Sequence, residues 1–297
     1  MKPKRQKGNF HQTITPLLFL LPNMVIFVLF IIVPAFQGLR MSFMRWGIFT
    51  DPKFVGIANF KELLGDSVFW VTFRNTLVYS VSVVLLLVVV SLILALLLKR
   101  NSLMGEKIFR AVFYIPSLLS MIAVGIAWRF VLGDEMGVLN HVVRSFGGDG
   151  INWLTDGRLA MTSVILVSGW ALSGYYMVIF ISGLQAIPTD LYEAARIDGS
   201  TPWKTFWLVT LPLLKSTVLV VVVLSTIASF KAYELIFAMT KGGPGYATKF
   251  IVQQVYQVAF MEDRMGYASA MSIVLMVVIG VFTAMQFVFS GKDQGYE

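Results

Sequence analysis

The chain has 297 residues, of which 57% are hydrophobic and 13% are charged, and its mean hydropathy is +0.76. Because soluble domains carry about 25% charged residues, this composition indicates a membrane protein, and we attribute the net charge of +8 to Lys and Arg near one membrane face rather than to nucleic-acid binding. The sequence has no cysteine, which excludes disulfides, thiolate catalysis and cysteine-ligated metals, and its two histidines, His11 and His141, are too far apart in sequence to favour a metal centre.

Six apolar runs are each long enough to cross a bilayer, which takes about 20 helical residues. We therefore predict an all-α membrane protein with six transmembrane helices, organised as one domain over residues 16–290 between an N-terminal tail (1–15) and a C-terminal tail (291–297). The first run is too long for a signal peptide and no cleavage site follows it. The predicted spans cover residues 16–39, 76–98, 109–132, 161–184, 216–239 and 268–290.

Basic residues predict the orientation of these spans. Lys and Arg are dense beside the membrane in the N-terminal tail, in the loop between the second and third spans, and in the segment 187–215. Cytoplasmic loops carry such an excess. Both termini and the segment 187–215 are therefore predicted to lie in the cytoplasm.

The polar segment 187–215 has the signals of two short helices. Asp190 is placed to cap the first helix and Glu193, three residues later, completes a capping-box pattern. Gly199 suits a left-handed cap at the end of this helix. Thr201 and Pro202 are typical of the start of a second helix.

One face of the first short helix carries small side chains. By i, i+3, i+4, i+7 spacing, this face combines Leu191, Ala194, Ala195 and Asp198. Small side chains allow a helix backbone to come close to a partner surface. The alternative is that the segment contains only helix caps and interfacial anchors, which leaves so much local structure in one loop without a purpose.

This segment resembles the EAA motif of permease subunits in ATP-binding-cassette importers. The resemblance is carried by Glu193-Ala194-Ala195, then Asp198-Gly199, then Thr210-Leu211-Pro212. In that family the short helix is the coupling helix, which sits in a cleft of a cytoplasmic ATPase. The resemblance implies that the ATPase-coupling residues are Leu191, Glu193, Ala194, Ala195, Asp198 and Gly199.

Further motifs resemble the carbohydrate-uptake branch of the same family, which includes maltose and glycerol-phosphate importers. They are Asn75, Ile115-Pro116-Ser117, the run 183–188, the run 239–248 and the run 266–270. This resemblance implies the type I importer permease fold in a bacterial plasma membrane. It also implies a heterodimer with a second permease, two ATPase subunits and an extracytoplasmic solute-binding protein.

No nucleotide-binding signature occurs in the sequence. There is no Gly-x-x-x-x-Gly-Lys-Ser/Thr, and no Ser–His or metal-ligand set that would support catalysis. We therefore expect a transport subunit that is not an enzyme, with no catalytic residue, metal or cofactor of its own. ATP and Mg are expected on the partner ATPase subunits.

Two charged residues, Lys231 and Glu234, fall within the fifth predicted span. Charge inside a span is costly and points to function. Their i, i+3 spacing predicts an intramembrane pair on one helix. This pair either orders the helix against a sister subunit or lines the transport pathway.

Hydroxyl-bearing and aromatic side chains, which bind sugars by hydrogen bonds and ring packing, gather in the fourth and fifth spans. In maltose-type permeases the positions of Ser173, Tyr176, Ser225 and Ser229 bind sugar, although amide side chains there are replaced here by Ser229 and Ala232. Hydrogen bonds between helices are the alternative role for each. The predicted pathway residues are Trp170, Ser173, Tyr176, Ser225, Ser229 and Tyr233.

The sequence therefore predicts the membrane subunit of an ATP-driven carbohydrate importer. Three alternatives remain at this point. The same machinery could import a polar non-sugar such as glycerol phosphate, which more basic cavity residues would favour. A secondary transporter would need internal inverted repeats, and a membrane enzyme would need a catalytic constellation.

Overall fold

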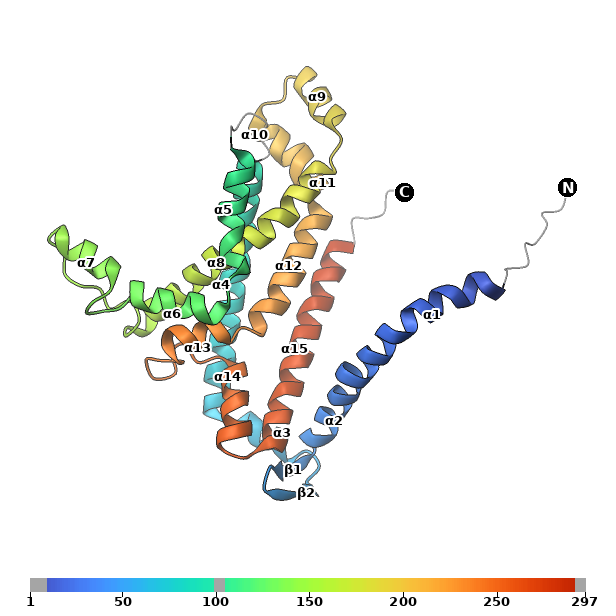
Figure 1. Cartoon of the computed structure of the whole chain (residues 1–297), viewed down its shortest axis with the longest axis vertical. Coiled ribbons are helices and arrows are strands. Elements are labelled where there is room, and N and C mark those ends of the chain that lie inside the picture. The colour runs from blue at the N-terminus through green and yellow to red at the C-terminus, as the bar shows by residue number, and fades with distance from the viewer. Residues whose placement is uncertain (1–9, 99–104, 292–297) are drawn as a thin grey trace. The chain divides into compact units, whose positions relative to one another are not determined.

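The computed structural model describes residues 10–98 and 105–291 (Figure 1). Most of the predicted N-terminal tail (1–15) and nearly all of the predicted C-terminal tail (291–297) lie outside the described residues. The described part divides into two compact units, one formed by residues 10–65 and 258–273 and the other by residues 66–257 and 274–291.

The first unit begins with a long apolar helix. This helix consists of α1 (Phe10–Phe27), a π-helical turn η1 (Val28–Ile32) and α2 (Val33–Ser42). A two-stranded antiparallel sheet follows, which departs from the predicted all-α fold. The remaining elements of this unit are β1 (Met44–Gly47), β2 (Thr50–Phe54), α3 (Ala58–Gly65) and the beginning of α15 (Met265–Gly291).

The hairpin of the first unit is fastened by polar contacts. The Asn59 side chain donates hydrogen bonds to the carbonyl oxygens of Ser42 (2.8 Å) and Met44 (2.9 Å). The Asp263 carboxylate accepts the backbone N–H of Ile48 at 2.5 Å. These bonds hold the hairpin against α3 and against the loop that precedes α15 in the same unit.

The second unit contains the remaining helices (Figure 1). Its helices before the polar segment are α4 (Ser67–Leu98), α5 (Glu106–Leu118), α6 (Met121–Val131), α7 (Val138–Ser145) and α8 (Gly157–Gln185). The polar segment forms α9 (Thr189–Ile197), α10 (Pro202–Thr205), η2 (Phe206–Thr210) and α11 (Leu211–Leu213). The last are α12 (Lys215–Phe230), α13 (Glu234–Thr240) and α14 (Ile251–Tyr256), with η3 (Gln257–Met261) leading out of the unit.

Four described helices are long and apolar enough to cross a membrane, and the number rises to six if each of two bent helix pairs counts as one span. The first bent pair, α5 and α6, turns by 98° inside the predicted span 109–132. Pro116 lies in the last turn of α5, and Leu119 and Ser120 are extended, so the helical hydrogen bonds cannot continue there. The second pair turns by 66° between Pro202–Leu213 and Lys215–Phe230.

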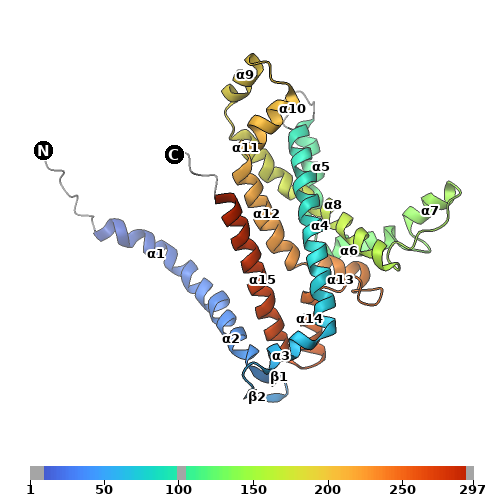
Figure 2. The same cartoon turned by 180° about the vertical axis from the view of Figure 1, so that it is seen from behind.

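The helix α8 is packed closely against three neighbours through glycine. A Cβ atom at Gly169 would overlap the side chain of Leu86 in α4, and one at Gly183 would overlap Thr217 in α12. At Gly174 it would overlap the carbonyl oxygen of Phe113 in α5. Figures 1 and 2, which view the chain from opposite sides, both show α8 crossing α4, α5 and α12. Glycine is the residue that allows such close helix contacts in a membrane.

The start of α8 is fixed by Asp156. Its carboxylate accepts the backbone N–H groups of Leu159 at 3.0 Å and of Arg158 at 2.9 Å. These hydrogen bonds lower the pKa of the Asp156 carboxyl below its usual value. Because the pKa is depressed in the folded state, this cap stabilises the fold above the ordinary carboxyl pKa and is lost as the pH falls through the lowered one.

We predict that Gly174→Ala destabilises the second unit, because the added methyl group meets a backbone carbonyl that cannot move without displacing α5. Overpacking of this kind costs about 1–3 kcal/mol or more, which lowers the melting temperature by several degrees. Thermal unfolding of the detergent-solubilised protein measures the effect. Gly280→Ala is the control, since nothing lies within 4 Å of a Cβ atom added there. Equal melting temperatures for the two variants would contradict the packing argument.

Candidate functional site

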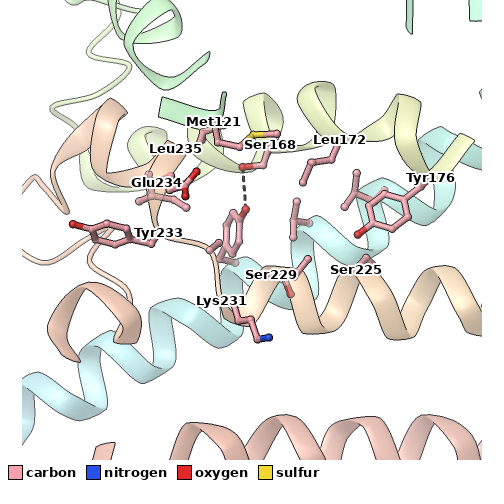
Figure 3. A pocket seen from close by; sticks show the side chains of 16 residues that line it. Met121, Ser168, Leu172, Tyr176, Ser225, Ser229, Lys231, Tyr233, Glu234 and Leu235 are labelled. Carbon is pink, nitrogen blue, oxygen red and sulfur yellow. Dashed lines mark hydrogen bonds between the residues drawn. The ribbon is translucent and has the colours of Figure 1, made fainter. Parts of the chain in front are cut away.

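A cavity of about 300 Å³ lies inside the second unit, among α4, α8, α12 and α13 (Figure 3). Its volume is at the lower end of the range for ligand pockets. Apolar side chains form much of the wall, with Met121 contributed by α6. The polar residues that line it are Tyr79, Ser168, Tyr176, Ser225, Ser229, Lys231, Tyr233 and Glu234.

The fifth predicted span is interrupted at this cavity. The helix α12 ends at Phe230, and α13 begins at Glu234. Between them, the backbone N–H of Lys231 donates to Ala228 at 3.2 Å, and that of Ala232 donates to Ser229 at 3.2 Å. The break brings the segment 231–234 to the edge of the cavity, where non-helical backbone is tolerated.

This break means that the predicted pair of Lys231 and Glu234 on one helix is not formed. The i, i+3 spacing brings side chains together only on a continuous helix. In Figure 3 the Glu234 carboxylate lies toward Ser168, whereas the Lys231 ammonium extends to the opposite side. The segment 225–239 contains no Gly or Pro, so the sequence gave no sign of the break.

The buried hydroxyl groups of the cavity are held by their own helices. Ser225 donates to Val221 at 2.6 Å and Ser229 donates to Thr226 at 2.8 Å, both to backbone carbonyl oxygens. Across the cavity, Ser168 donates to the carbonyl oxygen of Val164 at 2.7 Å. The Tyr79 hydroxyl donates to Ser168 Oγ at 3.0 Å, which links α4 to α8 (Figure 3).

Four of the six predicted pathway residues line the cavity: Tyr176, Ser225, Ser229 and Tyr233. The other two do not. Trp170 packs edge-on against Trp128, with ring centroids 5.4 Å apart. Ser173 is buried, and its carbonyl oxygen accepts a hydrogen bond from Ser91 of α4 at 2.9 Å. These two residues therefore serve helix packing in this structure.

Tyr79 and Ser168 also line the cavity, although neither was among the residues predicted from the sequence. Tyr79 lies on a buried face of α4 together with Thr72 and Thr76, at spacings of three and four residues. Polar side chains on one face of a span favour the protein interior over lipid. That pattern was the available signal for Tyr79, whereas nothing separates Ser168 from other serines in its span.

The second candidate site is α9, the short helix of the polar segment. Its end has the geometry of a Schellman motif: Gly199 has φ +72°, its N–H donates to Arg196, and the N–H of Ser200 donates to Ala195. The left-handed cap expected at Gly199 is therefore present. Thr201 caps the following helix by accepting the N–H of Lys204, also as expected.

The predicted capping box of α9 is wrong. Pro188 occupies the cap position, and no side chain accepts a hydrogen bond there. Asp190 lies within the first turn instead, where its negative charge favours the helix N-terminus. Glu193 therefore does not form the capping box that the sequence pattern predicted.

The surface of α9 is exposed, and no residue of this helix is buried in the described structure. Of the predicted coupling residues, Ala195 is partly buried, and the exposed ones are Leu191, Glu193, Ala194, Asp198 and Gly199. The helix is fastened from its other side, where Thr210 Oγ1 donates to the Tyr192 hydroxyl at 3.3 Å. A structured helix is thereby presented with one face open.

Together the fold and these two sites define a membrane transport protein of many spans, with a polar cavity among the helices and an exposed, capped helix. Among the described residues, no group of three His, Cys, Asp or Glu could hold a metal ion. The chain belongs to the family described as the inner membrane component of binding-protein-dependent transport systems, which matches residues 88–292. The prediction of an ABC importer permease, a transport subunit and not an enzyme, is confirmed.

Relatives of this family match nearly the whole chain. The probable ABC transporter permease protein YurN of Bacillus subtilis is 36% identical over 95% of this chain and 98% of its own length. The sn-glycerol-3-phosphate transport system permease protein UgpA of Agrobacterium fabrum is 35% identical over 97% of this chain and 98% of its own. The probable starch degradation products permease AmyD of Thermoanaerobacterium thermosulfurigenes is 30% identical over 93% and 94%.

The fold matches a solved importer. A chain from the crystal structure of a bacterial ABC transporter that imports the acidic polysaccharide alginate superposes with a TM-score of 0.84, covering 95% of this chain and 97% of that one at 23% identity. The predicted type I importer permease fold is confirmed by this likeness.

We predict that Gly199→Val loosens α9, because a β-branched residue is strained at a φ of +72°. Nothing lies within 4 Å of the added Cβ, so the effect comes from the backbone alone. Limited proteolysis is expected to cleave the segment 187–205 several times faster, with no change in the melting temperature of the membrane helices. Gly199→Asn, which tolerates a left-handed conformation, is the control; equal cleavage in both variants would contradict the role of the cap.

Proposed function

We propose that this chain is the membrane-spanning subunit of an ATP-driven importer, and that it translocates a carbohydrate delivered by an extracytoplasmic binding protein. The observation that carries the proposal is the cavity among α4, α8, α12 and α13, whose hydroxyl and aromatic side chains suit hydrogen bonds and ring contacts with a sugar. The names of two relatives, AmyD for starch degradation products and NgcF for diacetylchitobiose, support a carbohydrate.

The proposed mechanism is alternating access. The exposed α9 docks into a partner ATPase, which binds ATP and Mg, and closure of the ATPase displaces α9. Tyr192 and Thr210 connect α9 to the turn that leads into α12. Because Ser225 and Ser229 lie on α12, a displacement of α9 changes the wall of the cavity.

The proposed assembly contains a second, homologous permease, two ATPase subunits and a binding protein. A second permease and membrane lipid would cover the apolar side chains that this chain exposes, such as Phe19 at 82% and Phe30 at 72%. The proposed location is a bacterial inner membrane with α9 and both termini in the cytoplasm, an orientation that the distribution of basic residues in the sequence supports.

A second candidate cargo is glycerol phosphate. It is favoured by the 35% identity to permeases that are named for sn-glycerol-3-phosphate transport. The same cavity and the same coupling helix would serve that cargo, so the two candidates differ only in the charge that the cavity must accept.

We predict that Glu193→Ala leaves the protein inserted and folded but strongly reduces ATP-driven uptake, since α9 keeps its Schellman motif and loses an exposed carboxylate at the proposed docking surface. A loss of at least about tenfold is expected, the size typical of a hot-spot contact. Uptake in proteoliposomes and co-purification of the ATPase measure it. Asp149→Ala, another exposed carboxylate, is the control. Normal uptake in both variants would remove Glu193 from the coupling surface.

We predict that Ser229→Leu blocks transport, because a leucine side chain would occupy the cavity that the serine lines. Uptake should fall by roughly tenfold or more while the ATPase subunits still assemble with the permease. Ser229→Ala keeps the space and is expected to retain more uptake. If Ser229→Leu transported as well as Ser229→Ala, this cavity would not be the pathway.

A further inference from the structure

The two charged side chains that line the cavity, Glu234 and Lys231, extend in different directions. In Figure 3 the Glu234 carboxylate lies on the side of Ser168 and Met121, whereas the Lys231 ammonium extends away from them. Within the described part of the chain, Glu234 makes no ion pair. The charge presented to this side of the cavity is therefore negative.

The hydroxyl groups of the cavity act mainly as acceptors. Ser168, Ser225 and Ser229 each donate their proton to a backbone carbonyl oxygen, at 2.7, 2.6 and 2.8 Å. The Tyr79 proton is given to Ser168. A hydroxyl that donates in this way keeps a lone pair with which it can accept a hydrogen bond.

The remaining donor between these serines is the Tyr176 hydroxyl, which lies across from Ser225 at the far end of the cavity (Figure 3). The Tyr233 hydroxyl points away from the serines in the same view. Apart from the Lys231 ammonium, which extends away from these groups in Figure 3, the cavity thus combines a carboxylate and several acceptor oxygens with one inward phenol donor. A cargo with many O–H donors matches this set of groups. A phosphate or a carboxylate has oxygen acceptors and a negative charge, and matches neither the hydrogen bonds nor the charge.

We propose that this cavity selects neutral, hydroxyl-rich carbohydrates over phosphorylated or carboxylated ones, and that Glu234 is the specificity-determining residue. Its carboxylate accepts charge-assisted hydrogen bonds from the hydroxyl groups of the cargo and repels anions. This inference rests on the proposed function. The proposed selectivity would distinguish the cargo of this chain from that of relatives named for sn-glycerol 3-phosphate transport. The sequence identity of 35% to such a relative does not make this distinction.

The test uses the complete importer, with both permeases, the ATPase and the binding protein, reconstituted in proteoliposomes. Radiolabelled maltose, cellobiose and raffinose are the neutral probes, and sn-glycerol 3-phosphate is the anionic probe. ATP-dependent accumulation of a neutral probe without accumulation of the anion is expected. Accumulation of sn-glycerol 3-phosphate at a comparable rate would overturn the inference and leave an ATP-driven importer in place. No accumulation of any probe would contradict the proposed function itself.

The residue is tested by Glu234→Gln, which keeps the shape of the side chain and removes its charge. Uptake of the accumulated neutral probe is expected to fall about tenfold, the effect of replacing a charge-assisted hydrogen bond by a neutral one. Discrimination against sn-glycerol 3-phosphate is expected to weaken, which a purely structural role would not cause. Glu135→Gln, at an exposed carboxylate outside the cavity, is the control. Unchanged uptake and unchanged selectivity in Glu234→Gln would overturn the assignment to Glu234 while the proposed function stands.

Discussion

The close approach of α8 to its neighbours is the constraint on which the second unit depends. Gly169, Gly174 and Gly183 lie along one helix and let α4, α5 and α12 approach to distances that any Cβ would prevent. In a membrane, helix association relies on packing and hydrogen bonds because lipid is as apolar as the side chains. The same approach brings Tyr79 of α4 within hydrogen-bond distance of Ser168, and places both opposite the serines of α12. The cavity is thus a consequence of how the glycines pack.

The irregular backbone between α12 and α13 is also explained by the membrane environment. A membrane helix leaves its hydrogen bonds unmade only where protein or an aqueous cavity can replace them. The segment between α12 and α13 is such a place, and the N–H groups of Lys231 and Ala232 there donate to Ala228 and Ser229 in short turns. A continuous helix would have carried Lys231 and Glu234 on one face and allowed them to neutralise each other. The break separates them, which leaves the carboxylate available at the cavity.

The sequence predicted what depends on local chemistry. Apolar length predicted the membrane segments, and the residues that end and begin the short helices, Gly199 and Thr201, have the conformations that their chemistry favours. The breaks at Leu119 and Lys231 were not predicted, because the apolar length of a segment does not show where its helix is interrupted. The capping role of Asp190 failed because the helix begins earlier, at the proline turn. The outcome for the pathway residues is mixed because neighbouring hydroxyl groups have different surroundings: Tyr176 lines the cavity, whereas the Ser173 hydroxyl donates to the carbonyl oxygen of Trp170 in its own helix. A hydroxyl serves equally well in helix packing or in a binding site, so only the position of the neighbouring helices decides between the two roles.

The exposed helix α9 shows why local order without burial points to a partner. A helix of nine residues is marginal by itself in water, since nucleation is costly and few hydrogen bonds repay it. Here a Schellman motif closes one end, and the hydroxyl contact of Thr210 with Tyr192 helps to fasten the helix to the chain. These features hold its conformation without covering its surface. Because the fastening residue Thr210 precedes α12 by only a few residues, a rigid α9 can transmit a displacement directly to the helix that forms one wall of the cavity.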